Sequence, residues 1–490
     1  MKTDFDIAVI GSGFAGSLIA MIARRFGHSV VMIERGAHPR FAIGESSTPL
    51  ANLLLEELAD RYDLPGVRPL CKWGAWQKSL PHIGCGLKRG FTFLQHAFGQ
   101  PFTNELLVAA SPREAIADTH WYRADFDQHL VAQAQLLGVE YLDRTHLSVQ
   151  AHGTTGFALR TQSGTELRAG FLVDASGPRG FLHRELTLPE RSFDGFPKTQ
   201  TLFAHFSGVE KWSALHVSSN RAPYPPDDAA VHHVFDGGWV WVLRFNNGLT
   251  SAGAVVTGEL AADLALHEGA GAWARLLDRL PSVREQFANA KSATPFIHQP
   301  RVAFRTSAAA GAGWAMLPSA AGVVDPLLST GFPLTLLGIE RLARIIEGGC
   351  HADALADYER QTFSELDATA ALVAALYANM HDFETFSALT LLYFAAASFS
   401  ESARRLHRPE LARSFLLHDD PRFGPALREC CRAPHIARIY EAIEPFDVAG
   451  LGKRDRHPYY PALSEDFAEA AHKLGASRAD AAEALVRAGF

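Results

Sequence analysis

The stretch DIAVIGSGFAG, residues 6–16, leads after a predicted helix into a second apolar run that ends on Glu34. This order of strand, glycine loop, helix, strand and acid is typical of a dinucleotide-binding βαβ unit. Gly11 is expected to permit the tight turn, Gly13 to let backbone N–H groups approach a pyrophosphate, and Gly16 to let the helix pack on the strand. Glu34 stands where an acid accepts hydrogen bonds from ribose hydroxyls. Because strand, spacing and acid agree, the motif predicts a nucleotide site at the start of the helix.

The overall composition is that of an ordinary globular protein. The chain has 490 residues, of which 47% are hydrophobic and 20% charged, and its formal net charge is −7. This acidic balance argues against binding to a nucleic-acid backbone. The sequence opens on its predicted strand without a signal segment, and no apolar run approaches the roughly 18–20 residues of a membrane helix. We therefore expect a cytoplasmic protein with no membrane span and no nucleic-acid partner.

The cysteines and histidines show no metal-binding pattern. The five cysteines have neither C-x-x-C spacing nor Cys/His ligand spacing, and the 22 histidines are scattered. We expect reduced, structural thiols and no metal site.

The order of predicted elements indicates an α/β fold. We expect a Rossmann-like nucleotide-binding domain over residues 1–185 and 300–345, with strand-like runs near 81–108 joining the substrate sheet. Segments rich in β formers between 186 and 299 predict an inserted β-sheet substrate domain. The sequence from 346 to 490, rich in Ala, Leu and aromatic residues, predicts a C-terminal helical region.

Three further segments resemble the superfamily of FAD-dependent monooxygenases. The run FLVDASG, which contains Asp174, resembles its second flavin-contact strand. Arg123, within HWYRADFD, matches the arginine that the superfamily places near the flavin. The run AAGVVDPLLSTG, residues 320–331, looks like the final flavin motif, a loop that enters a helix. The resemblance implies that the Rossmann-like domain is an FAD-binding domain.

Two more segments resemble the flavin-dependent halogenases within that superfamily. The run CGLKRGFTF resembles the strand that carries their essential lysine, here Lys88. The run WVWVLR resembles their W-x-W-x-I-P signature, with Trp239 and Trp241 in the tryptophan positions near the tunnel. The tail LYFAAASFSE, residues 392–401, looks like the C-terminal part of the phenol- and pyrrole-type members.

The resemblance implies halogenation of an electron-rich aromatic substrate. Reduced flavin (FADH₂) and O₂ would oxidise chloride or bromide, held by backbone donors of Thr330 and Gly331, to hypohalous acid. Lys88 would hold this oxidant as an ammonium donor, or form a haloamine if an apolar wall lowers its pKa. The residues expected to bind FAD are Gly11, Gly13, Phe14, Ala15, Gly16, Glu34, Arg40, Ser47, Arg123, Asp174, Asp325 and Gly331.

The partners follow from the same resemblance. No second nucleotide loop for NAD(P)H is visible, which implies a separate NAD(P)H-dependent flavin reductase. The small aromatic substrate is either free or bound to a carrier protein.

The sequence departs from the family pattern at three places. Leu328 occupies the position of the glutamate that tryptophan-halogenating members carry, which favours a phenol-like substrate that activates its own ring. Arg244 replaces the proline of the tryptophan signature and requires a partner if it is buried. Leu317-Pro318 replaces Gly-Asp, so the aspartate that contacts the flavin ribityl chain is missing.

Simpler explanations exist for the same residues. Lys88 is also explained as an ordinary surface charge. Trp239, Trp241 and the aromatic tail are also explained as residues that pack in the core. Arg123 is also explained as one partner of an ion pair on its own helix. Two other functions also stay open. One is an FAD-dependent monooxygenase or oxidoreductase that does not use halide, and the other is a flavin-binding sensor or scaffold.

Overall fold

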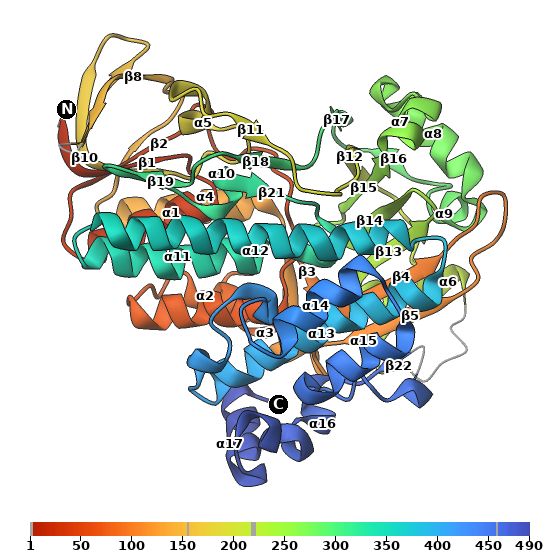
Figure 1. Cartoon of the computed structure of the whole chain (residues 1–490). Helices are drawn as coiled ribbons and strands as arrows, with labels where there is room; N and C mark the ends of the chain where they lie inside the picture. Colours follow the sequence, from red (N-terminus) through yellow and green to blue (C-terminus); the bar gives the residue numbers. More distant parts are fainter. Residues whose placement is uncertain (1–2, 154–155, 217–221, 457–458) are drawn as a thin grey trace.

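Two sheets, joined by long helices, organise the computed structural model (Figure 1). The structure describes residues 3–153, 156–216, 222–456 and 459–490. The mixed α/β architecture with parallel pairing and a helical C-terminal part confirms the predicted fold class.

The first sheet contains the predicted βαβ unit. Its strands run in the order β19 (Ala310–Gly311), β20 (Trp314–Met316), β10 (Glu166–Asp174), β1 (Asp4–Ile10), β2 (Val30–Ile33) and β7 (Glu140–Leu142), and β9 (Gly156–Thr161) and β8 (Leu147–Gly153) extend it from β10. β1 pairs in parallel with both β2 and β10, so that Ile10 lies between Ile33 and Asp174. The glycine loop, Glu34 and the loop after Asp174 therefore meet at one carboxyl edge, where parallel sheets bind their ligands.

Helices with buried faces pack on this sheet. α1 (Phe14–Arg25), which is buried over most of its length, contacts α4 (Arg123–Leu136) and α11 (Gly331–Glu347). α2 (Pro49–Arg61) packs against α11 and the C-terminal helix α13 (Phe383–Arg405). Thr48 caps α2 by accepting a hydrogen bond from the Ala51 N–H at 3.1 Å.

The second sheet is mainly antiparallel. Its strands run in the order β16 (Lys291–Ser292), β12 (Thr199–Ser207), β15 (Thr250–Thr257), β14 (Gly238–Arg244), β13 (Ala230–Phe235), β4 (Gly90–Gln95), β5 (Glu105–Ala109) and β22 (Tyr459–Tyr460), with β17 (Ile297–Gln299) paired to β12. Residues alternate between its faces, so Trp239 and Trp241 enter the core under the long helices while Val240 and Val242 enter a second core. That second core is covered by α7 (Gly258–Asp263), α8 (Ala270–Arg279) and α9 (Pro281–Gln286).

The segment that carries Lys88 is divided between two sheets rather than forming one strand. β3 (Cys85–Lys88) pairs with β6 (Asp118–Trp121) in a short ribbon, and the chain then enters β4 of the second sheet. The change of sheet occurs at Arg89, whose N–H donates to the Asp228 carbonyl. Lys88 thus lies at a junction between the ribbon and the second sheet.

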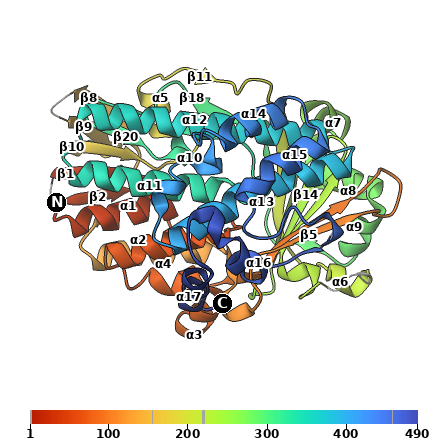
Figure 2. The ribbon, with the colours of Figure 1, turned by 60° about the horizontal axis from the view of Figure 1, so that its bottom comes forward.

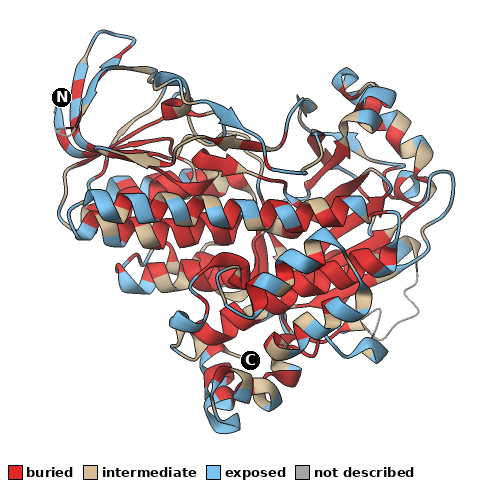
Figure 3. Cartoon of the chain, in the orientation of Figure 1, coloured by how far each residue is buried: buried red, intermediate tan, exposed pale blue. Residues whose placement is uncertain are grey.

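Long C-terminal helices connect the two sheets. α12 (Ala352–Ala378) lies beside α11 and crosses the molecule from the first sheet toward the second (Figure 1). Figure 2 shows α13 beneath this layer, with α15 (Ile436–Ile443) against it. α13 is buried around most of its circumference, as expected for a helix that is apolar on nearly all sides (Figure 3).

The remaining elements are short or peripheral. They are α3 (Trp73–Ser79), α5 (Phe181–Glu185), α6 (Trp212–Leu215), α10 (Pro318–Ala321), α14 (Phe423–Arg432), α16 (Leu463–Ala470), α17 (Arg478–Ala488), β11 (Glu190–Arg191), β18 (Phe304–Thr306) and β21 (Gly322–Val323). Within the described ranges, no helix is long and apolar enough to cross a membrane, and no group of His, Cys, Asp or Glu side chains is arranged to hold a metal ion.

Candidate active site

The glycine loop leaves backbone donors uncovered at the start of α1. Gly11 has a φ of +99°, and a Cβ there would lie 2.6 Å from the Ala175 carbonyl oxygen. A Cβ on Gly16 would overlap the carbonyl oxygen of Gly11, so the close packing of helix and loop requires glycine at this position. Gly13 caps α1 without a side-chain hydrogen bond, which leaves the N–H groups of Phe14 and its neighbours without partners inside the helix. Such an N-terminus is suited to bind phosphate.

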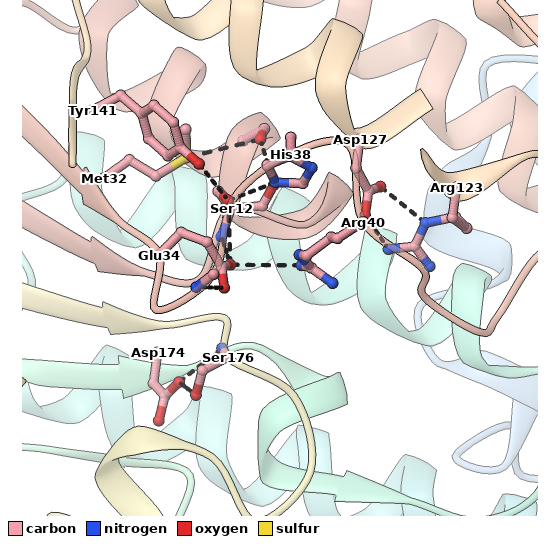
Figure 4. A network of polar contacts seen from close by, with 12 residues as sticks. Ser12, Met32, Glu34, His38, Arg40, Arg123, Asp127, Tyr141, Asp174 and Ser176 are labelled. Atoms are coloured by element: carbon pink, nitrogen blue, oxygen red, sulfur yellow. Dashed lines mark hydrogen bonds and ion pairs between the residues drawn. The ribbon is translucent and has the colours of Figure 1, made fainter. Parts of the chain in front are cut away.

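Glu34 follows β2 and organises the polar groups beside this loop (Figure 4). Its Oε2 accepts hydrogen bonds from the Ser12 N–H at 3.1 Å and the Ser12 hydroxyl at 3.2 Å, and its Oε1 accepts from the Gly36 N–H at 3.0 Å. The Arg40 Nη2 lies 3.5 Å from Oε2. Burial acts to raise the pKa of Glu34, but these hydrogen bonds and the Arg40 charge outweigh it and hold the pKa below its usual range.

Two guanidinium groups lie beside Gly13. A Cβ on Gly13 would be 3.5 Å from the Arg123 Nη2 and 3.6 Å from the Arg40 Nη2. The Arg40 Nε and the His38 Nδ1 are buried, and neither has a hydrogen-bond partner in the described part of the chain. Open backbone donors, two cations and unpaired buried nitrogens around one space fit an anionic dinucleotide such as FAD. We refer to Gly11–Gly16, Glu34, Arg40 and Arg123 as the nucleotide cradle.

Arg123 also has a structural role. Its Nε and Nη2 each donate to an Asp127 carboxylate oxygen at 2.8 Å, and its Nη1 donates to the Gly44 carbonyl at 2.8 Å. The ion pair on its own helix is therefore present, and it holds the guanidinium beside Gly13 (Figure 4). The two explanations of Arg123 are compatible.

Asp174 and Ser47 use their side chains to shape the chain next to the cradle. The Asp174 carboxylate accepts from the Ser176 N–H at 2.9 Å and the Leu182 N–H at 2.6 Å. Burial raises the pKa of Asp174, although these bonds oppose it. The Ser47 hydroxyl donates to the Thr119 carbonyl at 2.7 Å. Both residues stabilise loops, and direct contact with FAD stays a prediction for each of them.

The last predicted flavin segment forms a left-handed turn before α11. Leu328 and Ser329 have φ angles of +64° and +56°, which are sparsely populated for residues other than glycine. Thr330 is the N-cap of α11 without a side-chain cap, and Gly331 is exposed with nothing within 4 Å of a Cβ built on it. The start of α11 is thus open beside Gly331, where the sequence predicts the halide, and halide binding by Thr330 and Gly331 stays a prediction.

A hydrogen-bond chain connects this turn to the tryptophan signature. The Trp239 Nε1 donates to the Tyr377 hydroxyl at 3.1 Å, and that hydroxyl donates to the Asp325 Oδ2 at 3.0 Å. Burial raises the pKa of Asp325 to about 7, although the Leu327 N–H and the two aromatic donors oppose the shift. Trp239 and Trp241 are both buried core aromatics, and Trp239 also helps to hold the flavin segment. No sequence motif marked Tyr377, which reaches this hydrogen-bond chain from the C-terminal end of α12.

Lys88 is fully buried, so it is not a surface charge. Its ammonium donates to the Ser46 hydroxyl at 2.8 Å and to the Ser47 carbonyl. The Nζ atom lies 3.7 Å from the centroid of the Phe91 ring, in a cation–π contact. Burial lowers the pKa of Lys88, and the nearby Asp118 carboxylate opposes this shift.

The side chains around Lys88 are polar and incompletely paired. Asp118 is its cross-strand partner on β6, and the Asn52 amide donates to the Asp118 Oδ1 at 2.9 Å. The Asp118 Oδ2 and both ring nitrogens of buried His120 have no hydrogen-bond partner among the described residues. Burial raises the pKa of Asp118, and Lys88 opposes this. We call Lys88, Asn52, Phe91, Asp118 and His120 the Lys88 pocket.

Sequence reasoning missed three of these pocket residues. Asn52 and Asp118 belong to no motif, and the HWYRADFD motif, which begins at His120, gave that histidine no role. They meet Lys88 only because β6 pairs with β3 and Asn52 of α2 donates to Asp118. The alternation of the DTHW segment along β6 is the one signal that marks an extended strand there, and it does not indicate a partner.

An apolar cavity borders Phe91, the residue whose ring contacts the Lys88 ammonium. It has a volume of about 50 Å³ and is lined by Thr48, Pro49, Leu50, Phe91, Val108, Ala109, Ala110, Tyr393, Phe394, Ala397, Ser398, Glu401, Ala449, Leu451 and Leu463. The aromatic tail segment on α13 therefore lines a cavity in addition to packing in the core. Apolar lining with few polar groups is typical of small-molecule sites, but these usually measure roughly 300–1,000 Å³, so a ring enters this cavity only when its lining side chains move apart.

The structure accounts locally for the departures from the family pattern. The Arg244 Nη1 donates to the Val209 and Glu210 carbonyls at 3.0 and 3.1 Å, which supplies the partners that the sequence required. Leu328 is fully buried, as an apolar replacement of a glutamate demands. Pro318 occupies the first turn of α10, where its missing N–H costs nothing.

The chain is similar to proteins of known activity. The family model described as tryptophan halogenase matches residues 112–386. The chain is 29% identical over 347 residues to the monodechloroaminopyrrolnitrin halogenase of Pseudomonas fluorescens, covering 69% of this chain and 61% of that protein. It is 30% identical over 346 residues to the tetracycline 7-halogenase of Kitasatospora aureofaciens, covering 68% and 61%. The matched part thus spans about three fifths of the length of these two relatives.

A solved structure has the same fold. The halogenase PltM, crystallised with phloroglucinol and FAD, superposes with a TM-score of 0.82 over 93% of this chain and 99% of its own, at 24% identity. Since the family model covers more than half of the sequence, the family resemblance inferred from the motifs is confirmed. This chain belongs to the tryptophan halogenase family.

Proposed function

We propose that this protein is a flavin-dependent halogenase that chlorinates or brominates an electron-rich, phenolic aromatic substrate. The observation that carries the proposal is the fully buried Lys88 ammonium, held over Phe91 and surrounded by unpaired polar groups. Buried lysines are rare unless a paired charge or a function retains them. FADH₂, when bound, supplies with O₂ the two-electron oxidation of halide to hypohalous acid.

The nucleotide cradle is the part of the chain that would hold FAD. The N–H groups at the start of α1, together with Arg40 and Arg123, are suited to the pyrophosphate. Glu34 is suited to accept hydrogen bonds from the ribose hydroxyls. These bonds would replace its present contacts with Ser12 and Arg40. The reduced flavin comes from a separate NAD(P)H-dependent reductase, because the sequence contains one nucleotide loop.

Lys88 controls where the oxidant reacts. Its buried surroundings exclude bulk water, in which hypohalous acid would diffuse away. As an ammonium it donates a hydrogen bond to the oxidant. Because burial lowers its pKa, the neutral amine that forms a haloamine is also accessible near neutral pH.

A phenolic substrate follows from Leu328 and the cavity. A ring that carries its own hydroxyl needs no glutamate at position 328 to activate it, and the cavity beyond Phe91 is lined mainly by apolar side chains. The phloroglucinol bound to PltM, a phenol, supports this choice.

The first experiment follows products by mass spectrometry. The protein is incubated with FAD, a flavin reductase, NADH, air, bromide and resorcinol, and bromoresorcinol is expected. Ring hydroxylation that does not depend on halide would instead identify a monooxygenase.

Lys88→Ala is the decisive variant in the same assay. We expect the brominated product to fall by about a thousandfold, because the oxidant loses its binding group near the substrate. Lys291→Ala, which changes an exposed lysine, serves as the control and should brominate like the unchanged protein. Full bromination by Lys88→Ala would overturn the assignment of Lys88.

A further inference from the structure

Resting on the proposed function, we infer that Glu401 selects phenolic substrates: its carboxylate accepts the hydrogen bond of the substrate hydroxyl in the cavity beside Phe91. The family position for a glutamate near the substrate is filled by Leu328, and Glu401 comes from a different part of the chain, the end of α13. It is therefore a specificity residue supplied by the helical tail.

Glu401 is the single charged side chain among the residues that line the described cavity. Its neighbour in the lining, Ser398, donates its hydroxyl proton to the Phe394 carbonyl at 2.7 Å, and the Thr48 hydroxyl caps α2. The Glu401 carboxylate is thus the one charged acceptor in the lining, beside the hydroxyls of Thr48, Tyr393 and Ser398. Because the rest of the lining is apolar, a carboxylate there imposes a strong requirement for a hydrogen-bond donor on any bound ring.

One oxygen of Glu401 is engaged and the other is open. Its Oε1 accepts hydrogen bonds from the Arg405 Nε at 2.8 Å and the Arg405 Nη2 at 2.6 Å. No described residue donates to Oε2. Both side chains of this pair are largely buried, so Arg405 supplies the counter-charge that a buried carboxylate requires. The free oxygen of such a pair is a strong, charge-assisted acceptor.

The cavity and the Lys88 pocket share a wall. Phe91 lines the cavity, and its ring carries the Lys88 ammonium 3.7 Å from its centroid. Glu401 is also close enough to the pocket for its charge to raise the pKa of Asp118, in the same direction as burial and against the effect of Lys88. A phenol held by Glu401 would thus lie next to the group that holds the oxidant. Its ring would also be more electron-rich, because a hydrogen bond from the hydroxyl to a carboxylate raises the electron density of the ring.

Binding, measured without flavin or halide, tests this assignment. Isothermal titration calorimetry compares resorcinol with 1,3-dimethoxybenzene, which keeps the ring but lacks the O–H donors. Glu401→Gln is expected to weaken resorcinol binding about tenfold and to leave binding of the dimethoxy compound unchanged, since a charge-assisted hydrogen bond is lost. Glu410→Gln, at an exposed position five residues beyond α13, is the control and should bind both compounds like the unchanged protein.

A second variant covers the case in which Glu401→Gln does not fold. Ala397→Phe fills the cavity from the same helix and leaves both residues of the Glu401–Arg405 pair unchanged, and it should abolish binding of both compounds. Unchanged resorcinol affinity in Glu401→Gln, an equal loss for both compounds, or full binding by Ala397→Phe would overturn the assignment.

The result is separate from that of the bromination assay. Binding of resorcinol that depends on Glu401, without any bromination, would refute the halogenase and leave the phenol site standing. Bromination of resorcinol that is unaffected by Glu401→Gln would refute the phenol site and leave the halogenase standing.

Discussion

The nucleotide cradle and the Lys88 pocket are built in opposite ways. Most of the cradle comes from one continuous stretch, residues 11–40, and its charged groups are paired at the edge of the sheet. The Lys88 pocket brings together α2, β3, β4 and β6, and its polar groups are buried with several atoms unpaired. The comparison teaches that a nucleotide site is encoded locally, whereas a buried reactive lysine depends on how distant segments pack.

The largest effect is expected when the buried pair in the Lys88 pocket is broken. Asp118→Ala leaves Lys88 buried without its nearest carboxylate and should lower the free energy of unfolding by about 3 kcal/mol. The double variant Lys88→Met/Asp118→Leu should recover most of this loss, because it replaces both polar groups by apolar ones. Urea denaturation measures both values. A loss below about 1 kcal/mol in the single variant would mean that the pair carries little charge.

A smaller effect is expected from the pH dependence of Asp325. Its pKa is raised to about 7 in the folded protein, so the folded state binds the proton more tightly than the unfolded state. The stability that this proton contributes is full below the ordinary aspartate pKa and is lost as the pH rises through 7. Between pH 5 and pH 8 the loss is on the order of 2 kcal/mol.

Asp325→Asn removes this titration. The stability difference between the variant and the unchanged protein should therefore shift in favour of the variant as the pH rises from 5 to 8, as followed by urea denaturation at each pH. A difference that does not change with pH would show that Asp325 is ionised throughout, as the low pKa of Glu34 indicates for that carboxylate of the cradle.

The smallest effect is expected in the cradle. Glu34→Gln keeps an acceptor oxygen but loses the charge, and FAD should bind about tenfold more weakly, as measured by flavin fluorescence. The unfolding free energy should change little, because Arg40 is partly exposed and its Nη2 lies 3.5 Å from the Glu34 carboxylate. A large loss of unfolding free energy in Glu34→Gln would show that the cradle, like the Lys88 pocket, contains a buried charge on which the stability of the fold depends.

The motifs predicted the site correctly where the residues that act together are also neighbours in the sequence. The turn at Gly11, the uncapped start of α1 and the acid after β2 all lie where the glycine pattern predicted them. The family was also evident from short motifs, and the family model confirms it. Spacing along the chain suffices here because the loop, the helix and the strand form one supersecondary unit.

Prediction from the sequence was weaker for residues whose role depends on contacts with distant parts of the chain. The sequence placed CGLKRGFTF in one strand, but the run changes sheets at Arg89 because β3 pairs with β6. It did not indicate Tyr377, which links Trp239 to Asp325. No local pattern predicts such contacts, because the partners are more than fifty residues apart in the chain.

The sequence by itself determined the βαβ unit, the class of fold and the family, because these depend on glycines, apolar periodicity and motifs that act locally. The tertiary structure decided that Lys88 is buried, that Asp118 opposes it and that Glu401 lines a cavity next to it. The physical reason is desolvation. The charge state and hydrogen bonding of a side chain depend on every segment that removes water from it, and that set is assembled only when the whole chain folds.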